Sequence, residues 1–149
     1  MKISEGMFAI KLYELERQYG RMQSRLRLCR EEDHEKIRQE LEAIYDEFRE
    51  TELLLEKSVE SCRSPAVAAL SRAQQEYYRT IRLLLEKEIP KLMHCEATLP
   101  SEDEVEGVAL YAEYAMDFAV QSMRYALIAA LRAIDLEMST EEEGEHKDE

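Results

Sequence analysis

The sequence contains no tryptophan and only four glycines, three prolines and three cysteines in 149 residues. So few glycines and prolines argue against a sheet protein with many turns and against a disordered chain. Apolar residues make up 45% of the chain and charged residues 36%, a balance typical of helix-rich proteins that bury a core. The length is that of one ordinary domain. The composition therefore predicts a single all-α domain.

The chain also lacks any long uncharged apolar run. Glu5, Lys11 and Glu14 interrupt the first residues, which therefore do not resemble an export signal. Asp117 and Arg124 interrupt the most apolar region well before the ~20 residues that a bilayer requires. Three widely spaced cysteines, an odd number, favour free thiols in a reducing compartment. We expect a cytoplasmic protein that does not enter a membrane.

Familiar catalytic motifs are missing. The sequence contains no GxxxxGK(S/T), GxGxxG, HExxH or GxSxG pattern, and its scattered glycines form no phosphate-binding loop. We therefore assign no catalytic residue, cofactor-binding residue or metal ligand and expect no cofactor. An enzyme that takes its side chains from several helices would show no such motif and stays an alternative.

Apolar spacing predicts two helices in the first half of the chain. The first has apolar residues at alternating steps of four and three, which is the spacing of a coiled coil over three heptads. The acidic residues 31–33 break this register and predict a tight turn, after which the spacing restarts over 37–62. The first set comprises Phe8, Leu12, Leu15, Tyr19, Met22, Leu26 and Cys29.

Two further helices follow. Ser64 and Pro65 are a typical helix start, and the third helix should run to Ile89, where Pro90 predicts a stop or a kink. Residues 91–96 should add one more turn.

The fourth helix should begin with a capping box of Ser101 and Glu104 and extend to about Met138. Short connections favour antiparallel neighbours, so we predict an antiparallel up-down-up-down four-helix bundle with long helices over 1–138. The strongly acidic residues 139–149 contain no apolar side chain, and we expect a disordered tail.

The predicted fourth helix is apolar around most of its circumference. A helix of this kind requires burial on several sides, and its many alanines allow another helix to approach closely. Its polar residues form one narrow stripe: Glu113, Asp117, Gln121, Arg124, Arg132 and Asp135. We expect a homodimer formed through this helix, and a further protein partner that binds by helix packing.

Charge is unevenly distributed along the chain. Residues 97–149 carry 3 basic and 14 acidic side chains, whereas residues 1–96 are nearly balanced. This local acidity argues against a nucleic-acid partner or mimic. The basic run Arg17, Arg21, Arg25, Arg27 and Arg30 allows a binding patch, but pairing with the acids of the second helix is favoured.

One end of the predicted bundle also suggests a metal site. The up-down-up-down order would bring Cys29, His34, His94 and Cys95 to the same end, and two thiolates with two imidazoles can bind zinc. The spacing matches no known zinc finger. We therefore predict a non-enzymatic protein-interaction module, with metal or small-ligand binding at this cluster as the alternative.

The segment LLLEK occurs twice, at 53–57 and 83–87. Aligned at an offset of 30, Phe48 matches Tyr78 and Leu55 matches Leu85, all at predicted core positions. No third copy occurs, so we interpret the repeat as two solutions to one packing problem rather than as a duplication.

Overall fold

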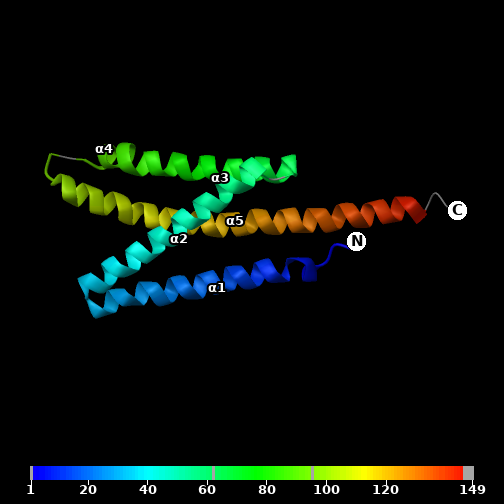
Figure 1. The fold of residues 1–149 in the computed structure, drawn as a ribbon, viewed down its shortest axis with the longest axis horizontal. Helices are drawn as coiled ribbons and strands as arrows, with labels where there is room; N and C mark the ends of the chain where they lie inside the picture. Colours follow the sequence, from blue (N-terminus) through cyan, green and yellow to red (C-terminus); the bar gives the residue numbers. More distant parts are fainter. Residues whose placement is uncertain (1, 62, 95, 146–149) are drawn as a thin grey trace. The chain divides into compact units, whose positions relative to one another are not determined.

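The computed structural model describes residues 2–61, 63–94 and 96–145, and this part of the chain is all-α, as predicted, with no strand. The long helices are α1 (Ala9–Leu26), α2 (His34–Ser61), α3 (Pro65–Leu83) and α5 (Pro100–Glu145). A short helix, α4 (Ile89–Met93), precedes α5 (Figure 1). The up-down-up-down order of these helices stays a prediction.

The chain divides into two compact units. Unit 1 combines the chain up to Arg27 with the chain from Tyr114 onward, and unit 2 comprises Leu28–Glu113. Unit 1 therefore contains α1 and most of α5, while unit 2 contains α2, α3, α4 and the first residues of α5.

A tight turn separates α1 and α2, as the acidic residues 31–33 predicted. A short 3-10 helix, Arg27–Glu31, follows α1, and Glu32 has a positive φ of 50°. Asp33 then caps α2, because its Oδ1 accepts hydrogen bonds from the backbone N–H groups of Glu35 (3.1 Å) and Lys36 (3.2 Å).

The start of α3 also confirms the sequence prediction. The Ser64 side chain accepts a hydrogen bond from the backbone N–H of Val67 at 3.4 Å, and Pro65 occupies the first helical position, where its missing N–H costs nothing. Helices α2 and α3 contact each other and run in opposite directions, so they form a helical hairpin within unit 2 (Figure 1).

The sequence predicted a stop or a kink at Ile89 before Pro90, and the structure has a π-helical turn followed by a short helix at this point. A π-helical turn, Leu84–Glu88, follows α3 directly, and Pro90 is the second residue of α4. A π-turn changes the hydrogen-bond register, so the missing N–H of Pro90 falls where the helix restarts. The two LLLEK segments therefore differ in local structure, since the first lies within α2 and most of the second lies in the π-turn.

The predicted capping box at Ser101 and Glu104 is wrong by two residues. The Leu99 carbonyl accepts the first hydrogen bonds of the helix, from the N–H groups of Glu102 and Asp103. In return, the Leu99 N–H donates to Glu102 Oε2 at 2.9 Å. Pro100 at the first helical position sets this register. At its other end α5 continues to Glu145, seven residues beyond the predicted end at Met138. Residues 139–145, predicted as part of a disordered tail, are therefore helical, and residues 146–149 of the predicted tail lie outside the described part.

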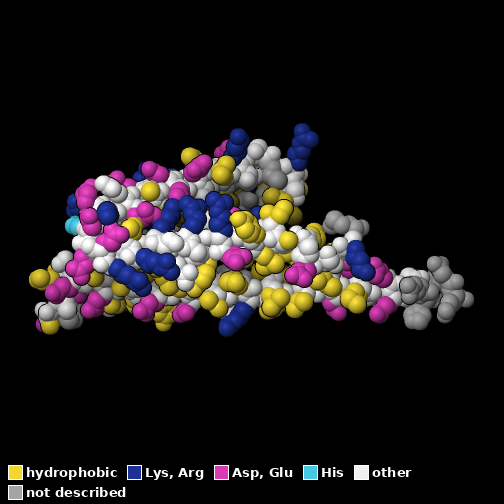
Figure 2. All heavy atoms as spheres, turned by 90° about the horizontal axis from the view of Figure 1, so that it is seen from below, with side chains coloured by type: hydrophobic (Ala, Val, Ile, Leu, Met, Phe, Trp, Pro, Cys, Tyr) yellow, Lys and Arg dark blue, Asp and Glu magenta, His cyan; other side chains and the backbone are white. Residues whose placement is uncertain are grey.

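The apolar side chains of the helices are largely exposed to solvent. Among the described residues no apolar side chain is buried, and hydrophobic side chains are visible across the face seen in Figure 2. The second half of α2 is partly covered by α3, which half-buries Phe48 and Leu55, whereas Leu41 in its first half is exposed. The predicted heptad positions are thus largely uncovered within the chain.

Candidate functional site

In unit 1 the amino-terminal segment lies on one face of α5. The Ile3 N–H donates to Glu137 Oε2 at 2.7 Å. Ala130 and Ala133 occupy the same face and are half-buried, while Ala126 on this face is exposed. Two of the alanines predicted to allow close approach are therefore partly covered within the chain, on the face that also carries Glu137.

The neighbouring face of α5 carries large apolar side chains that nothing covers in the described structure. We call this set the α5 flank. Its exposed members range from 50% to 59% exposed, and only Ile134 is half-buried. Steps of three and four residues place them on one side of the helix. The α5 flank consists of Val120, Met123, Leu127, Leu131, Ile134 and Met138.

A second apolar surface in unit 1 belongs to α1. We call it the α1 seam, and its residues are between 40% and 58% exposed. They are the heptad positions that the sequence predicted for the inside of a bundle, and they cover little of α5. The α1 seam consists of Leu12, Leu15, Tyr19, Met22 and Leu26.

The arginine run lies along the second half of α1 and the 3-10 helix after it. Arg17, Arg27 and Arg30 are exposed, whereas Arg21 and Arg25 are half-buried and each interacts with other groups. Pairing between this run and the acids of α2 stays a prediction.

The described structure does not assemble the predicted zinc ligands. Cys29 is an exposed free thiol, His34 begins α2 and His94 follows α4, while Cys95 lies outside the described residues. No group of three or more histidine, cysteine or acidic residues in the described segments could hold a metal ion. Metal binding at this cluster stays a prediction of the sequence.

His94 instead belongs to a polar network at the start of α5. Its Nδ1 lies 2.6 Å from Asp103 Oδ2, and the Thr98 hydroxyl donates to Asp103 Oδ1. The Asp103 residue is only 2% exposed. The hydrogen bond from Thr98, followed by that from His94, holds the pKa of Asp103 below its ordinary value. Residue spacing carried no signal for this network, because the irregular connection between α4 and α5 brings its members together.

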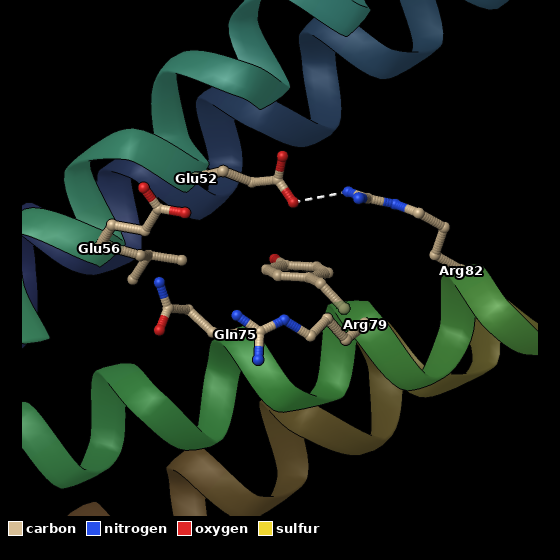
Figure 3. A pocket seen from close by; sticks show the side chains of 7 residues that line it. Glu52, Glu56, Gln75, Arg79 and Arg82 are labelled. Atoms are coloured by element: carbon tan, nitrogen blue, oxygen red, sulfur yellow. Dashed lines mark hydrogen bonds and ion pairs between the residues drawn. The ribbon is translucent and has the colours of Figure 1, made fainter.

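A polar groove of about 140 Å³ lies between α2 and α3 (Figure 3). An ion pair crosses it, since Arg82 Nη2 lies 2.6 Å from Glu52 Oε1. Beside the groove the rings of Phe48 and Tyr78 meet edge to face with centroids 5.2 Å apart. These contacts hold the hairpin together, and we assign the groove this structural role.

The fold and its surfaces define an all-α protein with extensive exposed apolar helix faces. Scans against protein-family models, curated proteins and solved structures each find no match. No helix in the described part of the chain is long and apolar enough to span a membrane.

Proposed function

We propose that the protein is a non-enzymatic interaction module that self-associates as a homodimer through α5 and binds a further protein by helix packing. The α5 flank supports this proposal, because Leu127 and Leu131 are 59% and 57% exposed in the single chain. Exposed apolar patches of this kind commonly mark protein-interaction sites.

Burial of the flank gives a simple driving force. Transferring a leucine side chain fully out of water stabilises by about 1.5–3 kcal/mol, and half-exposed side chains retain about half of that gain for a partner. A stable interface buries about 800 Å² on each partner. One helix face contributes part of this area, so the partner must cover a second apolar surface as well.

Light scattering on Leu127→Glu tests the proposal. The wild-type chain should be a dimer of twice 17.5 kDa at tens of micromolar, and Leu127→Glu should be monomeric, because it places a charge in the buried contact. Gln121→Glu is the matched control, since it adds the same charge to the polar stripe of the same helix and should remain a dimer.

A wild-type monomer at this concentration would refute the dimer. If both variants dimerise equally well, the dimer interface does not include the α5 flank. Circular dichroism of each variant shows whether the helices are intact.

A further inference from the structure

Unit 1 carries opposite charges at its two ends. Arg17 and Arg27 are exposed with no acid between them, and residues 137–145 contain five glutamates and no basic residue. Ile3 lies beside Glu137, and α1 and α5 run in opposite directions within this unit (Figure 1). The arginines therefore lie at the end of α1 that is far from the acidic end of α5.

These charges cannot neutralise each other within one chain. At 1.5 Å per residue, Arg27 lies about 27 Å along α1 from Ala9. Glu141 and Glu142 lie beyond Glu137 in the opposite direction. Screening in physiological salt acts over ~8 Å, so the two ends do not interact across this separation.

The apolar surfaces beside the charges share one spacing. From Leu15 the α1 seam advances by four, three and four residues to Leu26, and from Leu127 the α5 flank advances by the same steps to Met138. This spacing allows two helices to interlock as in a coiled coil. Each surface therefore has the pattern that the other requires.

We propose that the α1 seam of each copy packs parallel to the α5 flank of the other copy in a two-fold symmetric dimer. If Leu15 lies opposite Leu127, Met22 meets Ile134 and Leu26 meets Met138 of the second copy. In this register Arg27 lies opposite residue 139 and within one helical turn of Glu142 of the second copy. The inference rests on the proposed homodimer and identifies the second surface that covers the α5 flank.

Symmetry explains the direction of packing. Within one chain α1 and α5 are antiparallel, and a two-fold axis across the helices reverses the second copy, so its α5 runs parallel to the first α1. Both contacts then form simultaneously, and each basic segment meets an acidic segment. A parallel pairing of two α1 helices would instead bring two arginine runs together.

Charge-reversed chains test this arrangement. One chain carries Arg27→Glu with Arg30→Glu, and the other carries Glu141→Lys with Glu142→Lys. Each chain alone brings like charges together at both contacts, and its dimer dissociation constant should rise about tenfold or more. An equal mixture should restore a one-to-one heterodimer, because both contacts regain opposite charges. Native mass spectrometry separates the heterodimer from either homodimer by mass.

Arg63→Glu with Arg72→Glu is the matched control, since it gives the same net charge on exposed residues of unit 2 and should dimerise as the wild type does. Dimers of both reversed chains as tight as wild type, or no heterodimer on mixing, would overturn the proposed pairing. These outcomes leave the homodimer itself standing, whereas a monomeric wild-type chain would remove the dimer as well.

Discussion

At Gly107 the helix α5 lies close against α4. A Cβ atom placed there would lie 2.9 Å from Ile89 Cγ2, which is closer than packed carbon atoms tolerate. The β-branched Ile89 has little freedom to move away. A Cβ atom placed on Gly20, in the interior of α1, would have no neighbouring atom within 4 Å beyond the adjacent backbone of its own helix.

Alanine at these two glycines should have opposite effects. Gly20→Ala should raise the free energy of unfolding by about 0.5–1 kcal/mol through its higher helix propensity. Gly107→Ala should lower it by about 1 kcal/mol, because overpacking outweighs the same propensity gain. Urea denaturation followed by circular dichroism measures both, and equal stabilisation by the two changes would contradict the close approach.

Asp103 makes the connection before α5 sensitive to acid. Its folded pKa lies below its unfolded value, so its stabilising contribution is complete above the ordinary aspartate pKa of about 3.9 and is lost as the pH falls through the lower folded pKa. Asp103→Asn should therefore melt at a lower temperature than wild type at pH 6, and the difference should shrink toward pH 2.

Glu104→Gln removes an exposed neighbouring carboxylate and should show no comparable difference. A difference between wild type and Asp103→Asn that stays constant from pH 6 to pH 2 would show that the Asp103 carboxylate does not supply the effect.

At the scale of the elements, the hairpin of α2 and α3 depends on an aromatic contact. Phe48 and Tyr78 meet edge to face, and Tyr78 also meets Tyr77 with ring centroids 5.7 Å apart. Tyr111 at the start of α5 joins this group, and burial, with a smaller contribution from Tyr77 and Tyr78, raises its pKa. These rings link α2, α3 and the first part of α5 within unit 2.

Phe48→Ala should destabilise the protein by about 2 kcal/mol, because it removes a half-buried ring and its aromatic partner. Leu54→Ala is the control on the same helix, since Leu54 is 60% exposed and should cost no more than about 0.5 kcal/mol. Guanidinium denaturation of both variants gives the comparison. If both variants lose the same free energy of unfolding, the contact between Phe48 and Tyr78 does not stabilise the hairpin.

The sequence predicted these elements well where local chemistry decides them. Ser64 capped α3 as expected, and the acids at 31–33 marked the turn before α2, because a cap or a turn needs only a few adjacent residues. The repeat alignment also paired Phe48 with Tyr78, which touch in the structure. The π-turn before Pro90 was missed, since a helix can absorb a proline in several ways that residue type does not distinguish.

At the scale of the whole molecule, spacing showed which side chains form apolar faces but could not show what covers them. The heptads of α1 predicted the inside of a bundle, whereas in the structure Leu15 and Tyr19 are 47% and 58% exposed. A periodic pattern describes one helix at a time, and its partner can belong to the same chain or to another. The sequence thus identified the apolar face of α5, on which a dimer stays a prediction, and it did not show that the α1 seam is exposed in the structure.

The hairpin of α2 and α3 has a consequence for synthesis. Its contacts join neighbouring helices and are complete once residue 83 has been made, so it can fold while the ribosome is still adding α5. The α5 flank is translated after the hairpin, when α1 of the same chain has already emerged. The exposed apolar side chains of the α5 flank therefore emerge only after the hairpin can fold.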